Sequence, residues 1–210
     1  PGMPEGHIME SWEQIEAILV SGSADMLRDF LGSLPPAEIA RAMSRLREED
    51  QSSVITLLSP DEAADMLEQM TDAQSAEILE DLPPNTAAAI VDRMVSDERA
   101  DLLAELNKED AEAILRQMDP DEAKATRQLL TYAPSTAGGI MITEYLAYPV
   151  SMNVGDVLKD LRDNAEHYAD YAVQYCYVVT DAGALPGVIQ LRDLVLSPNE
   201  TPLTSIMLKN

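Results

Sequence analysis

A twelve-residue repeat runs through the first two-thirds of this sequence. Leucine or methionine recurs at a constant spacing of twelve, at Leu34, Leu46, Leu58, Met70, Leu82, Met94, Leu106, Met118 and Leu130. Self-similarity at a fixed period is the signature of one small structural unit that is stacked many times. The repeat therefore predicts a stack of similar elements rather than an ordinary enzyme core.

Each repeat carries the signals that begin a short helix. Side chains that can cap a first helical turn follow several anchors, at Ser59, Thr71, Asn107 and Asp119. Three residues later come side chains that can complete a capping box, at Glu62, Gln74, Asp110 and Glu122. Proline occupies the first helical position, where a missing N–H costs nothing, at Pro36, Pro60, Pro84 and Pro120. The unit near Met94 is irregular, and we expect Ser96 to cap its helix in place of Val95.

Apolar pairs eight and nine residues after the anchors predict the buried face of each helix. These pairs are Met66/Leu67, Ile78/Leu79, Ile90/Val91, Leu102/Leu103 and Ile114/Leu115. Helices of about eight residues are roughly 13 Å long and unstable in isolation, so they must bury these faces against one another. We therefore predict a mostly α-helical chain in which residues 10–131 form a right-handed superhelix of short stacked helices.

The pattern changes after Leu130. Pro134 and the Gly138–Gly139 pair indicate a linker over residues 132–139. Beyond it, hydrophobic periodicity and β-branched content predict a strand, a helix, two strands and a last short helix, over residues 145–150, 154–167, 173–180, 188–191 and from Asp193 onward. Residues 140–210 are thus predicted to form a small α+β domain.

The repeat region is strongly acidic. The chain carries a formal net charge of −24, and residues 1–130 hold 29 acidic against 10 basic side chains, a net of −19. This charge argues against nucleic acids and anionic membranes, because phosphate binding needs clustered Lys and Arg. It fits a cation or a basic partner, and it equally fits a surface that only keeps the chain in solution. Apolar runs of about five residues are far below the ~20 of a spanning helix, so the chain by itself is expected to be soluble.

Nothing in the sequence points to catalysis. There is no P-loop, no G-x-S-x-G and no H-E-x-x-H. Cys176, the single cysteine, excludes an internal disulfide and fits a reducing compartment. Its place in a predicted strand favours a small core residue over a nucleophile. We therefore expect a chain that is not an enzyme.

Taken together, the two patterns resemble the cytosolic part of the MgtE family of magnesium channels. The Leu-Pro-Pro and Leu-Ser-Pro-Asp-Glu helix starts resemble its N domain, and the run from Tyr132 to Tyr145 resembles the entry into its first CBS domain. The segments Tyr175-Cys-Tyr-Val-Val-Thr-Asp and Gly187-Val-Ile-Gln-Leu-Arg-Asp are similar to the central strands of that domain. The resemblance implies a single CBS domain over residues 140–210, the second copy and the transmembrane pore being absent.

The resemblance also implies a function and a metal. It implies Mg²⁺ bound between the two domains to hold the channel gate closed, with Asp65, Asp97, Asp101 and Gly138 at the matching positions. Asp97 and Asp101 are four residues apart and share a helix face, and Mg²⁺ is typically held by one or two carboxylates and waters. Such acids can also be an ordinary solvated face. The implied partners are a second copy of the chain through the CBS region, and a pore domain that places the chain at the cytoplasmic face of a membrane.

Two further functions stay open. Some CBS domains bind ATP or AMP, and the resemblance places Tyr175, Arg192 and Asp193 at such a site. Asp193 can instead simply cap the following helix, and one of Tyr175 and Tyr177 is expected to lie in the core. Stacks of short helices also resemble flagellar motor switch proteins, so a scaffold that binds a protein on its superhelix is the other alternative.

Overall fold

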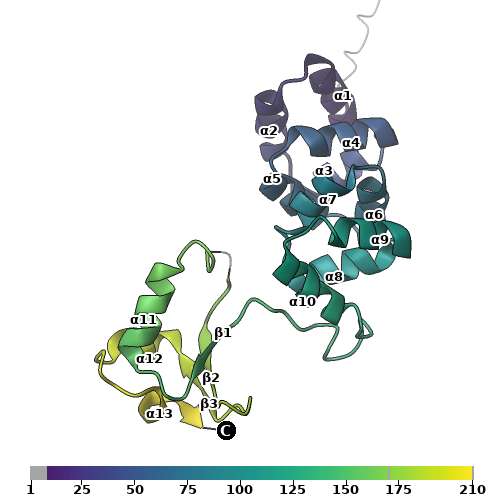
Figure 1. Cartoon of the computed structure of the whole chain (residues 1–210). Coiled ribbons are helices and arrows are strands. Elements are labelled where there is room, and N and C mark those ends of the chain that lie inside the picture. Colours follow the sequence, from purple (N-terminus) through teal and green to yellow (C-terminus); the bar gives the residue numbers. More distant parts are fainter. Residues whose placement is uncertain (1–8, 170, 210) are drawn as a thin grey trace, which may run out of the picture. The chain divides into compact units, whose positions relative to one another are not determined.

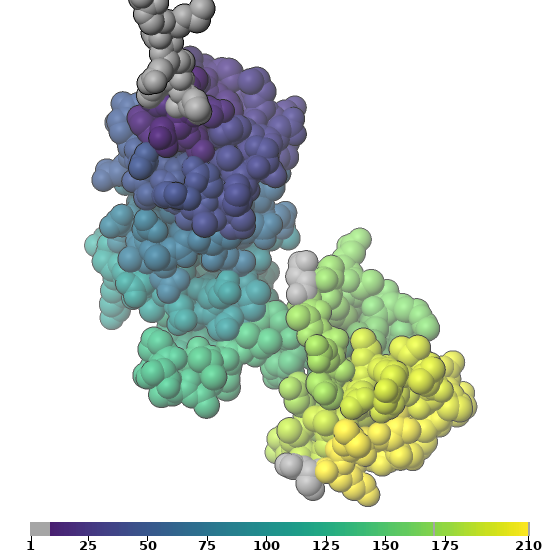
Figure 2. All heavy atoms as spheres, turned by 180° about the vertical axis from the view of Figure 1, so that it is seen from behind, coloured from purple at the N-terminus to yellow at the C-terminus, as the bar shows by residue number. Residues whose placement is uncertain are grey.

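The computed structural model describes residues 9–169 and 171–209. The chain divides into two compact units, Pro1–Met141 and Ile142–Asn210. The first is a stack of helices that follow one another in chain order (Figure 1), and in the space-filling view its successive segments keep that order along the stack (Figure 2). The helices are α1 (Ser11–Ser21), α2 (Ala24–Gly32), α3 (Pro36–Met43), α4 (Glu48–Leu57), α5 (Pro60–Leu67), α6 (Asp72–Glu80), α7 (Pro84–Val91), α8 (Ser96–Glu105), α9 (Lys108–Leu115) and α10 (Pro120–Leu129).

Helices that are two repeats apart pack against each other in this stack. Helix α6 contacts α4 and α8, and α8 also contacts α10, while α7 lies between α5 and α9. From α4 to α10 the even-numbered helices thus form one row, and α5, α7 and α9 form a second row, whereas α1 contacts both α2 and α4. The predicted apolar pairs are all buried in the core between the rows. The prediction of a stack of short helices is confirmed, while its right-handed winding stays a prediction.

Most of the predicted N-caps are confirmed, whereas most of the predicted capping boxes do not form. Ser59, Thr71, Asn107 and Asp119 all cap their helices. The expected cap at Ser96 is wrong, because Val95 is the N-cap of α8 and Ser96 is buried as its first residue. Of the four expected capping boxes, the one between Ser59 and Glu62 forms. Glu122 does not turn back to its own cap because it pairs with Arg99 at 2.7 Å.

The second unit is built around a sheet of order β1-β2-β3-β4. Its elements are β1 (Leu146–Pro149), α11 (Val154–Asp163), β2 (Tyr175–Val179), β3 (Gly187–Gln190), α12 (Leu191–Leu196), α13 (Leu203–Ile206) and β4 (Leu208–Lys209). Strands β1 and β2 are parallel and are joined through α11, and the other pairs are antiparallel. The predicted order of elements is confirmed, and α13 and β4 were not foreseen. The assignment of this unit as a CBS domain stays a prediction.

Strand β2 decides which side chains enter the core of this unit. Cys176 and Val178 are buried there, which confirms the core position predicted for the cysteine. Tyr175 and Tyr177 lie on the opposite face and are 44% and 37% exposed. The expectation that one of these tyrosines is in the core is therefore wrong, because strand alternation places both on the same face. None of the described helices has both the length and the apolar character that crossing a membrane requires.

Candidate metal and nucleotide sites

The three aspartates predicted to bind metal lie on the acidic faces of α5 and α8. Asp65 is exposed on α5, and Asp97 and Asp101 are partly exposed on α8. Helix α8 is oriented by Leu102 and Leu103, which are each 1% exposed in the core. The Oδ1 atom of Asp97 accepts a hydrogen bond from the N–H of Glu98 at 3.0 Å. Its negative charge also suits the N-terminal end of the helix.

Asp101 lies among other carboxylates. Partial burial raises the pKa of Asp101, and the negative charges of Asp72, Asp97 and Glu105 raise it further. Asp72 comes from α6, which packs against α8. The structure therefore brings Asp97 and Asp101 together, as their spacing predicted, and adds Asp72 from the neighbouring helix.

A second acidic group surrounds Glu68, a residue that the sequence did not single out. Burial raises the pKa of Glu68 to about 7, together with the charges of Glu98 and Asp65 and a hydrogen bond with Glu98. The N–H of Val95 donates to Glu68 and lowers that pKa. Glu68 ends α5 and Val95 precedes α8, so this contact joins Asp65 to the start of the helix that holds Asp97 and Asp101. The sequence alone does not predict this contact, because it depends on how α5 packs near α8.

The acidic face fits a hydrated cation better than a closed chelate. Among residues 9–169 and 171–209, no three His, Cys, Asp or Glu side chains converge as a metal would require. A small cavity of about 130 Å³ adjoins the carboxylates of Glu68, Asp72 and Glu98, and Ser75, Met94 and Leu102 also line it. Mg²⁺ keeps several of its waters and binds through one or two carboxylates. Carboxylates whose pKa values are raised by mutual repulsion are stabilised when a cation approaches.

Gly138 lies in the turn segment after α10. A Cβ atom at Gly138 would lie 2.5 Å from the ring of Tyr132. Close packing against this ring is therefore a sufficient reason for a glycine at that position. A role of its carbonyl in metal binding remains a prediction.

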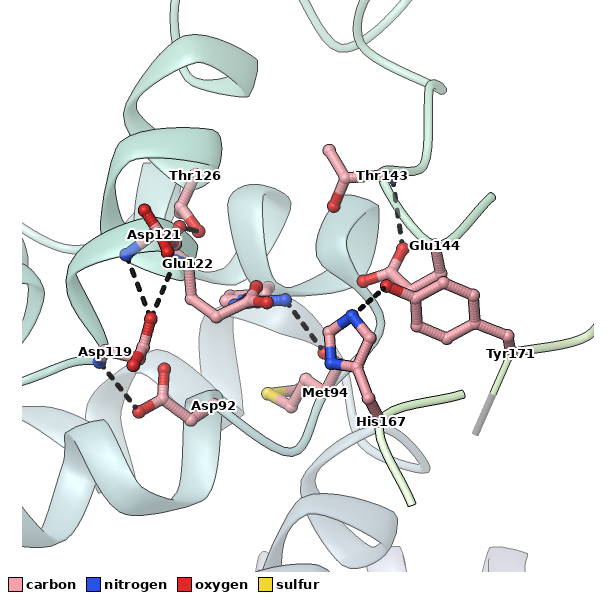
Figure 3. A network of polar contacts seen from close by, with 11 residues as sticks. Asp92, Met94, Asp119, Asp121, Glu122, Thr126, Thr143, Glu144, His167 and Tyr171 are labelled. Carbon is pink, nitrogen blue, oxygen red and sulfur yellow. Dashed lines mark hydrogen bonds and ion pairs between the residues drawn. The ribbon is translucent and has the colours of Figure 1, made fainter. Parts of the chain in front are cut away.

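A buried arginine holds the helix that carries two of the predicted ligands. Arg99 is 2% exposed, pairs with Glu122 of α10 at 2.7 Å and donates to the carbonyl of Met94 at 3.3 Å. Figure 3 shows the adjoining network, in which Asp119 accepts from the N–H of Glu122 at 3.4 Å and its own N–H donates to Asp92 at 3.3 Å. The pair of Arg99 and Glu122 links α8 to α10, and the contact between Asp119 and Asp92 links the start of α10 to the end of α7. A lone arginine within an acidic helix start was the only signal for this role in the sequence.

The predicted nucleotide residues lie near the junction of β3 and α12. Tyr175 is paired with Gln190 in the antiparallel register, and Gln190 is the N-cap of α12. Arg192 and Asp193 are in the first turn of that helix, with Arg192 Nη2 3.4 Å from Asp193 Oδ1. The alternative that Asp193 is a helix cap is wrong, because Gln190 holds that position. An exposed ring, a guanidinium and a carboxylate can contact a base, a phosphate and a ribose, respectively.

Most of the helical unit matches the model of a known protein family, and parts of the chain are similar in sequence to known proteins. The family model for the MgtE intracellular N domain matches residues 34–135. The chain is 39% identical over 79 residues to the magnesium transporter MgtE of Thermus thermophilus, covering 38% of this chain and 17% of that protein. It is 37% identical over 89 residues to the Enterococcus faecalis transporter MgtE, covering 41% and 18%. The matched segments thus span less than a fifth of these relatives.

Two solved structures resemble the chain over nearly its whole length. The soluble part of a magnesium transporter matches with a TM-score of 0.74 and 28% identity, covering 96% of this chain and 78% of that structure. The cytosolic domain of the Mg²⁺ channel MgtE in complex with ATP matches with a TM-score of 0.78 and 32% identity, covering 93% and 79%. Both units of the chain are therefore covered by the similarity.

Proposed function

Because this chain belongs to the MgtE family of magnesium transporters, we propose that it is the magnesium-sensing regulatory region of a magnesium channel. The family consists of transporters rather than enzymes, which confirms the prediction that the chain is not an enzyme. The proposal places the chain on the cytoplasmic side of a membrane, attached to a pore domain. The observation that carries it is the acidic face of α5, α6 and α8, where partial burial and then repulsion from neighbouring carboxylates raise the pKa of Asp101.

In this mechanism Mg²⁺ acts by neutralising repulsion. Asp65, Asp97 and Asp101 would hold a hydrated ion, with the carbonyl of Gly138 as a further oxygen ligand. The ion would draw the first unit toward the CBS-like second unit and favour the closed gate. It shifts that equilibrium only to the extent that it binds the closed form more tightly than the open form.

The test compares the chain in chelator and in excess Mg²⁺. Mg²⁺ at ten times its dissociation constant stabilises a fold by about 1.4 kcal/mol, so we expect a higher melting temperature and a smaller radius of gyration by X-ray scattering. Asp101→Asn should reduce both effects. Asp29→Asn, which removes an exposed carboxylate from α2, is the matched control. Equal responses of the two variants would contradict the assignment of the site.

Nucleotide binding is a second proposed function, supported by the position of Tyr175, Arg192 and Asp193 near the junction of β3 and α12. A similar cytosolic domain has been solved in complex with ATP. In this chain Tyr175 would stack on the base, Arg192 would contact phosphate and Asp193 would contact the ribose. We expect ATP or AMP to raise the melting temperature, and Asp193→Ala to abolish the rise. Asp181→Ala, in the exposed turn after β2, should leave it unchanged.

A homodimer through the second unit is the proposed assembly. Tyr145 and Tyr177 pack edge to face with ring centroids 6.0 Å apart, and both are exposed. Leu208 is exposed as well, and such apolar surface is typical of a covered face. Light scattering should give twice the monomer mass, and Tyr177→Glu should lower it. A monomer at high concentration would contradict this assembly.

A further inference from the structure

The N-terminal half of the helical unit contains a groove that the proposed magnesium and nucleotide sites do not use. It has a volume of about 750 Å³ and lies between the end of α1, helix α4 and the turn between α6 and α7. Its apolar part is formed by Leu19, Val20, Leu57, Leu82 and Pro83. Leu82 is 6% exposed and belongs to the core, whereas the side chain of Val20 is 91% exposed. The groove thus has a fixed apolar floor and an apolar edge open to solvent.

The rim of this groove is acidic. Glu16, Asp50 and Asp81 line it. An adjoining hollow of about 710 Å³ shares Arg47 and Asp81 with the groove. That hollow adds the carboxylates of Glu48, Glu49, Glu77 and Glu80.

The positively charged side chain on this rim already forms an ion pair. Arg47 is the one basic side chain among the described residues that line the two hollows. Its Nη2 atom lies 2.8 Å from Asp50 Oδ2. The rim therefore presents a strongly negative field beside apolar surface, and that field attracts cationic groups.

We propose that this groove, here called the α1–α4 groove, is a docking site for a basic amphipathic helix of a partner protein. Its lining consists of helices and a turn, so no strand edge is available for main-chain pairing. Recognition must then come from side chains, and an amphipathic helix presents apolar anchors at i, i+3, i+4 and i+7. Flanking Lys or Arg side chains would meet the acidic rim, which gives specificity and fast association.

Other occupants fit the charges poorly. An anionic membrane surface attracts basic segments and would be repelled by this rim. A second copy of the chain carries a net charge of −24, so its surface would meet like charge. The acids of the groove and hollow are also different residues from Asp65, Glu68, Asp97 and Asp101. The groove can therefore act whether or not magnesium binds at Asp65, Asp97 and Asp101.

The test uses a fluorescent 14-residue peptide of leucine and lysine with leucines at helical spacing. Fluorescence anisotropy of the full 210-residue chain should give saturable binding at micromolar concentration. A scrambled peptide of the same composition should bind at least tenfold more weakly, because it lacks the apolar stripe. Hydrogen exchange should slow in α1 and α4 when the first peptide is bound. Binding to anionic vesicles in place of the peptide would overturn the proposal.

Matched variants separate the groove from diffuse attraction to an acidic chain. Val20→Asn should weaken peptide binding about tenfold through loss of apolar contact, whereas Val195→Asn, at an exposed valine of α12, should not. Glu49→Gln with Glu77→Gln should weaken binding and reduce its salt dependence. Removing two exposed carboxylates elsewhere, with Glu109→Gln and Glu166→Gln, is the charge control. Equal effects of the groove and control variants would overturn the proposal.

Discussion

Removing the carboxyl charge of Glu68 should make the helical unit more stable at neutral and alkaline pH. Partial burial, with the nearby Glu98 and Asp65, raises the pKa of Glu68 from 4.5 to about 7. For a fully buried group that difference would correspond to about 3.4 kcal/mol. Because Glu68 remains exposed to solvent, screening reduces the expected contribution to about 1 kcal/mol.

The sign of the pH dependence follows from proton linkage. Between pH 4.5 and 7 the folded state binds more protons at Glu68 than the unfolded state does. The free energy of unfolding therefore falls as pH rises through this window, and the loss is complete above about pH 7. Glu68→Gln cannot titrate, so this part of the pH dependence disappears in the variant.

Urea unfolding at pH 4.5 to 8 is the assay, followed by the fluorescence of Trp12. This single tryptophan packs against the core of the helical unit, so it reports on that unit. We expect Glu68→Gln and the natural chain to differ little at pH 4.5, and the variant to be about 1 kcal/mol more stable at pH 8. Glu109→Gln on α9 is the control for loss of one exposed carboxylate. A difference between the variant and the natural chain that is the same at every pH would refute the reasoning.

Three further predictions concern the framework that positions the acidic face. Glu122→Gln should lower the free energy of unfolding by about 3 kcal/mol, because it removes the carboxylate charge that pairs with the buried Arg99; an unchanged urea midpoint would contradict this. Leu79→Ala, at a core residue that is 1% exposed, should cost about 2–5 kcal/mol, measured in the same way. Gly139→Ala should lower the melting temperature more than Gly138→Ala. At Gly139 the new Cβ would overlap the backbone of residues 133 and 134, whereas at Gly138 it would overlap a side chain, that of Tyr132.

Features that repeat along the chain could be predicted with residue accuracy. Pro36, Pro60, Pro84 and Pro120 all stand at the first position of a helix. The pair Leu102/Leu103 is buried, as its position in the twelve-residue repeat predicts. These predictions succeed because local capping and amphipathic spacing act within a few residues.

Predictions failed where a distant contact outweighed a local preference. Ser96 is a better cap than Val95 by its chemistry, yet burial of Ser96 sets the start of α8 one residue earlier. Glu122 was expected in a capping box but pairs with Arg99, 23 residues away. The position of Glu122 near the cap of its helix could not reveal that Arg99 binds its carboxylate instead.

The sequence by itself determined the stacked short helices, the acidic charge and the small α/β unit that follows. These features follow from the twelve-residue repeat, the residue composition and the local hydrophobic periodicity. Tertiary structure alone decided that Glu68 at the end of α5 meets the start of α8, and that the predicted ligands Asp97 and Asp101 stand on a helix held by a buried arginine. The physical reason is that a carboxyl group takes its pKa from burial and from charges in space, and the packing of alternate helices, rather than chain order, sets those neighbours.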